Sequence, residues 1–326
     1  MDYPTDNHLP EDPIDAKEKE DEETRRKVGE YLLANLDTEV SRTIPTFGGS
    51  DITPQPVREC LKTFVELTIR YARLERLFQG DVIFTLPAHT RIIEDNLTGD
   101  PLTDGRLLAE EERRTLELGS APLDDFEEIL DEKGIKIFPV ASPFTAAGVL
   151  FGEETGPAIL LTHPPHSFEG RMALAHAYGH FIADINPYKN RFCLLGSKLQ
   201  ESPEEERAES FARHFLMPLE AIPLDIDPEG EEVDAFAHAY EVPAGVARLQ
   251  GLQHADPEAL WQFPRREILP EDPNWKPSMP MRYLNFVLAA YHRKLLQPEG
   301  MQVLLKASLE QVEELLRWVR QEQKGR

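Results

Sequence analysis

Apolar residues recur along the chain at helical and strand-like spacings, and these spacings predict where helices and strands form. The clearest helical pattern covers residues 55–78, where apolar side chains step by three and four positions. The side chains on this face are Val57, Cys60, Leu61, Phe64, Leu67, Tyr71, Leu74 and Phe78. Pro54 precedes the stretch and Gly80 follows it, so we predict one long amphipathic helix between them.

Three short apolar runs in the middle of the chain have the character of strands. They are Ile135–Val140, Ala147–Phe151 and Ala158–Thr162, separated by the turn-forming segments ASPFTA and GEETGP. Their length and their turns predict a small sheet. Two helices are predicted after it, over EGRMALAHAYGHFIAD and EEERAESFARHFL. The pattern as a whole is typical of an α+β fold.

Changes in composition along the chain predict five regions. Residues 1–22 are acidic and contain almost no large apolar side chains, so we expect a disordered tail. A helical N-terminal region follows over 23–104, and a mixed helix and strand domain over 105–254. A proline-rich linker is expected at 255–280, and a C-terminal helical module at 281–326.

The charge of the chain restricts the partners that it can bind. The net charge is −24, and such an acidic surface repels a phosphate backbone, so we expect no direct nucleic-acid binding. Two cysteines, Cys60 and Cys193, are too few for a disulfide framework or a cysteine zinc cluster, and a reducing compartment fits best. The N-terminal segment lacks the pattern of a signal peptide, and no apolar run is long enough for a membrane span. We therefore expect a soluble, cytoplasmic protein.

The chemistry of the chain is concentrated in the first of the two helices after the strands. His176 and His180 lie four residues apart, which places both rings on one helix face, where they can bind one metal ion. The spacing alone is weak, but Glu205 on the next predicted helix could supply a third ligand. The alternative is that Glu205 belongs to a solvated acidic run. Asp184 could orient a ligand, although an exposed aspartate at the helix end is the favoured interpretation.

Several segments together resemble the ImmA/IrrE family of zinc metallo-endopeptidases, from about Phe64 to the C-terminus. The segment GRMALAHAYGHFI is similar to the zinc helix of that family, and EERAESFARHFLMP is similar to the helix with its third ligand. Softer similarities are found in LTIRYARLERLFQ, in LDDFEEILDEKGIKIFPV and in the C-terminal segment that begins MRYLNFVLAAYHRKLL.

The resemblance implies a zincin-like core with a small three-stranded sheet and two metal-site helices, flanked by helical segments. It makes His176, His180 and Glu205 the zinc ligands, with Glu206 as the alternative to Glu205. It places Glu209 where the family usually has an asparagine.

Two departures from the family pattern change the expected function. Ala177 stands where the family has the glutamate that takes a proton from zinc-bound water, so the chain has no expected catalytic residue. Losing such an acid/base group costs typically 10²–10⁴-fold in rate, or about 3–5 kcal/mol of barrier. In addition, the acidic residues 1–54 do not resemble the helix-turn-helix domain that usually precedes the family's peptidase domain.

The resemblance therefore implies a regulatory protein with impaired peptidase activity. Members of the family cleave a repressor in response to stress or prophage induction, so the expected partner is a transcriptional repressor or a component of a toxin–antitoxin system. One alternative is an active zinc endopeptidase in which Glu209 or Asp184 replaces the missing base. The other is an interaction scaffold that has lost its metal.

Overall fold

The computed structural model describes a chain of helices around one small sheet. The residues that it describes are 13–47, 54–80, 98–140, 142, 146–152, 154–183, 190–194, 202–223, 227, 230–255 and 279–322. The N-terminal helices are α1 (Pro13–Leu33), α2 (Asp37–Thr43), η1 (Ile44–Phe47) and α3 (Gln55–Gln79). The middle of the chain contains α5 (Pro101–Thr115), α6 (Phe126–Glu132), β1 (Lys136–Pro139), β2 (Ala146–Gly152), β3 (Gly156–Leu161), α7 (Phe168–Ala183), β4 (Arg191–Leu194) and α8 (Pro203–Leu216). The remaining elements are η3 (Leu219–Ala221), α9 (Glu231–Ala239), α10 (Ala244–Ala255), α11 (Met281–His292), α12 (Pro298–Leu305) and α13 (Leu309–Glu322).

The α+β class predicted from the sequence is confirmed, but the predicted number of strands was wrong. Among the described residues the sheet has four strands in the order β1-β3-β2-β4, with β1 parallel to β3 and the other pairs antiparallel. The additional strand is β4, in which Cys193 pairs with Ala147 of β2. Four residues are too few for a recognisable alternation, so only the pairing with β2 reveals this strand.

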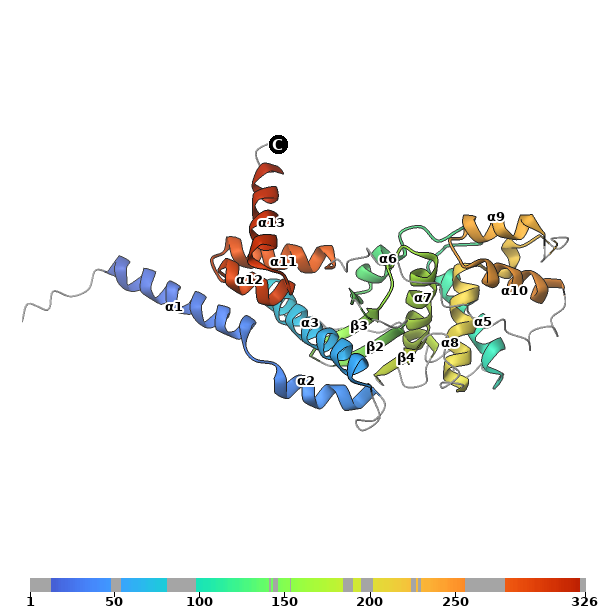
Figure 1. Ribbon diagram of the computed structural model, residues 1–326, viewed down its shortest axis with the longest axis horizontal. Helices are drawn as coiled ribbons and strands as arrows, with labels where there is room; N and C mark the ends of the chain where they lie inside the picture. The colour runs from blue at the N-terminus through green and yellow to red at the C-terminus, as the bar shows by residue number, and fades with distance from the viewer. Residues whose placement is uncertain are drawn as a thin grey trace, which may run out of the picture.

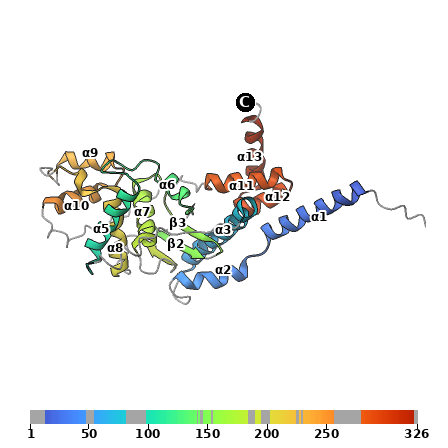
Figure 2. The same cartoon turned by 180° about the vertical axis from the view of Figure 1, so that it is seen from behind.

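Alternation along the strands gives the sheet two different faces. One face carries Ile137, Ala147, Val149, Ile159, Leu161 and Cys193, and it belongs to the same buried cluster as α7 and α8. The opposite face carries Phe138, Leu150, Ala158 and Leu160, and it packs with α3 and the helices α11–α13. The two views show α7 and α8 on one side of the sheet and α3 with α11 and α12 on the other (Figures 1 and 2).

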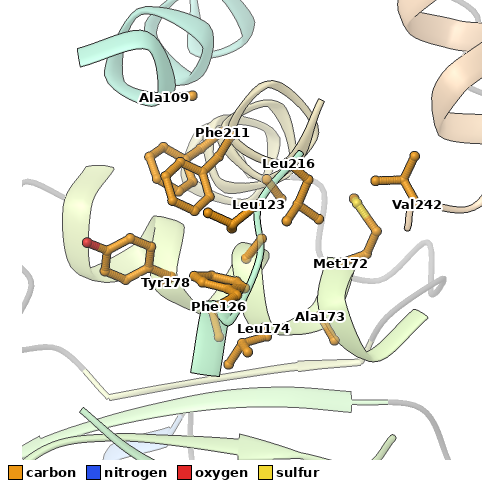
Figure 3. Close-up of a cluster of buried hydrophobic side chains, with 14 of the residues drawn as sticks. Ala109, Leu123, Phe126, Met172, Ala173, Leu174, Tyr178, Phe211, Leu216 and Val242 are labelled. Carbon is orange, nitrogen blue, oxygen red and sulfur yellow. The ribbon is translucent and has the colours of Figure 1, made fainter. Parts of the chain in front are cut away.

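Helix α7 is buried almost all round, because it lies between the sheet and α8. Aromatic rings from three helices fill the space beside it, with Tyr178, Phe126 and Phe211 in one contiguous cluster (Figure 3). Gly179 permits the close approach of the two helices. A Cβ atom at this position would lie 3.0 Å from Phe211 Cδ1 and 3.2 Å from the carbonyl oxygen of Ala208. The short distance between α7 and α8 brings the start of α8 near the histidines of α7.

The opposite face of the sheet is an apolar core that also contains one buried ion pair. The rings of Tyr71, Phe138 and Tyr283 pack against one another at centroid distances of 5.3–6.1 Å. Lys136 Nζ lies 3.0 Å from Glu75 Oε2, and both side chains are at most 3% exposed. This pair connects β1 to α3, while Tyr283 connects α11 to the same core.

The first helix begins earlier than the sequence analysis predicted. Helix α1 starts at Pro13, inside the segment 1–22 that we expected to be a disordered tail. Proline is favoured at the first position of a helix, and oppositely charged residues four apart, such as Glu23 and Lys27, support the helix locally without a core. Most of the predicted linker, residues 256–278, lies outside the described residues, and the other region boundaries stay predictions. No helix in the described part of the chain is long and apolar enough to cross a membrane.

Candidate metal centre

The two histidines of α7 lie on one helix face, as their spacing predicted. His176 is 3% exposed and His180 is 2% exposed. Their Nε2 atoms are 3.2 Å apart. The rings therefore present their Nε2 atoms to the same small volume in the protein interior.

Glu205 reaches that volume from the first turn of α8. Its Oε2 lies 3.2 Å from His176 Nε2, and its Oε1 lies 3.5 Å from His180 Nε2. Ser202 caps the helix by accepting a hydrogen bond from the backbone N–H of Glu205. A carboxylate at this end of a helix is favoured by the helix dipole. The structure thus brings together the three residues that the sequence analysis selected as metal ligands.

Cys193 is a fourth member of the group that the sequence analysis did not include. Its Sγ lies 3.4 Å from His180 Nε2 and 3.2 Å from Glu205 Oε1, and the residue is 2% exposed. The strand β4 directs this side chain to the face of the sheet that α7 covers. No sequence motif marks the position, because the residue becomes a neighbour of the histidines only through the pairing of β4 with β2.

The four side chains could hold one metal ion. One donor atom from each of His176, His180, Cys193 and Glu205 lies within 4.8 Å of each of the other three. Imidazole nitrogen, thiolate sulfur and carboxylate oxygen are all common ligands of transition metals in proteins. The residues present therefore fit a metal centre both in chemistry and in spacing.

The same contacts shift the pKa values of three of the groups, Glu205, Cys193 and His176. Burial alone would raise the pKa of Glu205, but the hydrogen bond and the charge of His176, with that of His180, outweigh it and lower the pKa to about 2. Burial would also raise the pKa of Cys193, and the two histidines reverse that effect and lower it. For His176, burial favours the neutral ring, but hydrogen bonds with Cys193, Glu205 and Glu209 raise its pKa well above the usual value.

The structure also places the other residues considered in the sequence analysis. Ala177, which follows His176 directly in the sequence, is 1% exposed and packs in the apolar cluster on this side of the sheet. Glu206 is exposed, which disfavours it as the alternative to Glu205. Glu209 Oε2 lies 3.5 Å from Nδ1 of His176, on the ring edge opposite to Nε2. Asp184 lies outside the described residues.

Comparison with known proteins does not identify the chain. No protein-family model matches it, and no curated protein sequence matches it. The description of the centre therefore rests on its own residues and their distances.

Proposed function

We propose that this protein is a metal-dependent regulatory protein that binds a protein partner without cleaving it efficiently. The observation that carries the proposal is the meeting of His176, His180 and Glu205 beside a buried alanine at position 177. The resemblance to the ImmA/IrrE metallopeptidases implies the same three ligands and a glutamate in place of that alanine. We therefore propose a zincin-like core that retains its metal ligands and lacks the general base needed for hydrolysis.

Zinc is the metal that we propose for the centre. It is bound in proteins by histidine nitrogen, cysteine sulfur and carboxylate oxygen, and it accepts mixed sets of these ligands. Magnesium and calcium prefer oxygen ligands alone, so a group with two imidazoles and a thiol disfavours them. In a hydrolytic enzyme the zinc would supply an activated water molecule at neutral pH.

Among the residues that the structure describes, neither carboxylate beside the histidines is positioned to replace the missing general base. A general base has to lie within hydrogen-bond reach of the water that it deprotonates. Glu209 contacts Nδ1 of His176, whereas the metal-facing atom of that ring is Nε2. This position is typical of a group that orients a metal-binding histidine and fixes its tautomer. Glu205 already faces the histidines as a ligand, so the active-peptidase alternative gains no support from either residue.

The proposed partner is a transcriptional repressor or a component of a toxin–antitoxin system. The resemblance supplies this class, because family members act on such proteins. The net charge of −24 favours a partner with a basic surface, and DNA-binding repressors have one. A metal-free scaffold is the weaker alternative, because it gives no reason for four potential ligands to meet in a buried site.

The experiment compares binding with cleavage for the full chain. Zinc-loaded protein is mixed with the repressor encoded nearest to its gene, binding is measured by calorimetry, and cleavage is followed by mass spectrometry with and without a chelator. We expect measurable binding and no chelator-sensitive cleavage over hours. Efficient, chelator-sensitive cleavage would show an active peptidase, and partner binding by a protein that holds no metal would favour the metal-free scaffold.

A further inference from the structure

Cys193 lies on the third side of the site, opposite the two helices that carry the other donors. The strand β4 is anchored by its pairing with β2, in the register Cys193 with Ala147. Its thiol is buried and contacts both His180 and Glu205. The four donors therefore come from three separate elements, α7, α8 and β4. A metal bound to all of them would be enclosed by the protein.

With Oε1 as the oxygen of Glu205, four of the six distances between the donor atoms are close to those of a tetrahedral metal site, and all four donors lie within 4.8 Å of one another. Metal–ligand bonds of about 2.0–2.1 Å for nitrogen and oxygen and about 2.3 Å for sulfur give tetrahedral edges of roughly 3.3–3.6 Å. The two histidine Nε2 atoms are 3.2 Å apart, and each lies 3.2–3.5 Å from an oxygen of Glu205. The sulfur of Cys193 lies 3.4 Å from His180 Nε2 and 3.2 Å from Glu205 Oε1. The sulfur of Cys193 thus lies at about the edge length of such a tetrahedron from two of the other three donors.

Hydrogen bonding alone does not explain this arrangement. An imidazole Nε2 has one bonding position in the ring plane, where it either donates one proton or accepts one. Nε2 of His180 nevertheless lies within 3.5 Å of His176 Nε2, Cys193 Sγ and a carboxylate oxygen of Glu205. A single hydrogen bond can serve one of these neighbours, whereas a metal ion at a common centre serves all of them.

From these contacts we infer that Cys193 is the fourth ligand of the metal, in the coordination position that a hydrolytic zinc site leaves to water. Catalytic zinc sites bind the metal through three protein ligands and one water, while structural sites use four protein ligands and are closed. The inference rests on the proposed metal binding and deepens it. Two independent features would then both prevent hydrolysis. Ala177 provides no general base, and Cys193 would occupy the position of the water that such a base activates.

A closed site has a consequence for the fold. The metal would connect β4 to α7 and α8, so that its binding free energy contributes to the stability of the folded state. The thiolate would hold the edge strand of the sheet against the helices. The centre would then be a structural element of the fold, with no position for an exchangeable substrate.

Cobalt substitution of the full-length protein tests whether sulfur is a ligand. Co²⁺ is added to chelator-treated protein, and absorption is recorded in the visible and near-ultraviolet ranges. We expect intense tetrahedral bands in the visible range and a thiolate-to-cobalt charge-transfer band in the near ultraviolet. The variant Cys193→Ser should lose the charge-transfer band and bind the metal at least about tenfold more weakly, since even outer-shell changes cost 10–100-fold.

Cys60 provides the matched control, because it is also buried but lies in the apolar core on the other face of the sheet. Cys60→Ser should keep the charge-transfer band and the affinity for Co²⁺. If Cys193→Ser does not fold, X-ray absorption of the zinc-loaded wild type decides, since one sulfur at about 2.3 Å is expected. Metal binding with no sulfur ligand would overturn the inference and leave the proposed function intact. Absence of any metal binding would overturn both.

Discussion

The apolar cores on the two sides of the sheet each contain one cysteine, and the pKa values of the two thiols shift in opposite directions. Cys60 is 5% exposed and Cys193 is 2% exposed, so their burial is nearly the same. Burial raises the pKa of Cys60 to about 12, because its surroundings on α3 are apolar. For Cys193 burial acts in the same direction, but His180 and His176 outweigh it and lower the pKa. Burial alone keeps a thiol protonated and inert, whereas neighbouring imidazoles favour the thiolate, which is the form that binds metals.

The same contrast holds for the charged groups on the two faces. On the α3 face, Lys136 and Glu75 form an ion pair at 3.0 Å, and Arg282 lies 3.5 Å from the same carboxylate. On the α7 face, Glu205 meets two histidines and a thiol with no lysine or arginine among the four donors. Opposite charges complete the first group, whereas the second group has the donors to hold a cation that all four could share.

The largest expected effect is the loss of metal when a histidine of the centre is removed. His180→Ala should reduce bound zinc from about one ion per chain to a small fraction, because three donors remain around a cavity. At free zinc about 1,000-fold above the dissociation constant, the bound metal contributes roughly 4 kcal/mol to the free energy of unfolding, and the variant should lose it. Elemental analysis and thermal unfolding measure the two effects.

His214→Ala is the control for that substitution. His214 is as buried as His180, at 2% exposure, and its Nδ1 lies 2.7 Å from the carbonyl oxygen of Ser210 on the same helix. The variant should lose stability through this local contact and keep its zinc. Equal loss of zinc in both variants would mean that the metal responds to general destabilisation of the α7 face.

The second prediction concerns the chemistry that Ala177 and Cys193 remove together. The variant Ala177→Glu alone should stay inactive, because Cys193 still fills the position of the water. Ala177→Glu combined with Cys193→Ala should open that position and supply a base, with a gain of up to 10²–10⁴-fold in chelator-sensitive cleavage at saturating zinc. Unfolded casein and the neighbouring repressor serve as substrates in a time course resolved by mass spectrometry.

Ala177→Gln with Cys193→Ala separates base catalysis from changes in packing. Ala177 is 1% exposed, so either longer side chain should lower the melting temperature to a similar extent. Glutamine cannot take a proton, and its double variant should show no gain in cleavage. Cleavage by Ala177→Glu alone at the rate of the double variant would contradict the closed coordination of the metal.

How much of this contrast the sequence predicts depends on how local each feature is. The helices α3 and α8 follow from apolar periodicity over a dozen residues or more, and the pair His176 and His180 follows from spacing within one helix. Cys193 could not be predicted in the same way. It enters the site through β4, whose four residues gain their structure from β2, more than forty positions earlier in the chain. The start of α1 at Pro13 was missed for another reason, since composition alone does not distinguish a charged helix from a charged tail.

The third prediction concerns the spacing between α7 and α8, for which we expect a smaller effect on stability and zinc binding. Gly179→Ala adds a methyl group 3.0 Å from Phe211 Cδ1 and 3.2 Å from the carbonyl oxygen of Ala208, so these neighbours on α8 have to shift by a few tenths of an ångström. We expect a loss of about 1–3 kcal/mol in the free energy of unfolding and weaker zinc binding, because Glu205 moves with α8. Denaturant unfolding and zinc titration with a competing chelator measure the two quantities.

Gly245→Ala is the matched control for that substitution. Gly245 lies on α10, and nothing lies within 4 Å of a Cβ atom built there. Alanine in this helix should be neutral or stabilise by roughly 0.5–1 kcal/mol. Zinc affinity should not change in this variant. A normal zinc affinity in Gly179→Ala would show that the centre tolerates separation of the two helices.

The smallest expected effect is a difference between metal-free and zinc-loaded protein in how the free energy of unfolding depends on pH. In metal-free protein the pKa of His176 is raised above its unfolded value of about 6.5. Its contribution to the free energy of unfolding is therefore fully present below a pH of about 6.5 and is lost as pH rises through the folded pKa. Metal binding requires neutral imidazoles, so zinc-loaded protein should gain stability over the same pH range. Glu205 does not contribute to this difference between pH 6 and 8. Its pKa is about 4.3 in the unfolded chain and about 2 in the folded one, so its stabilising contribution is lost only as pH falls through this lower range. The difference in unfolding free energy between loaded and chelator-treated protein should therefore rise with pH, by up to about 1.4 kcal/mol per unit for each proton that the metal displaces. A difference that stays flat from pH 6 to 8 would mean that the metal displaces no proton from His176, and the ring would then lie outside the coordination sphere.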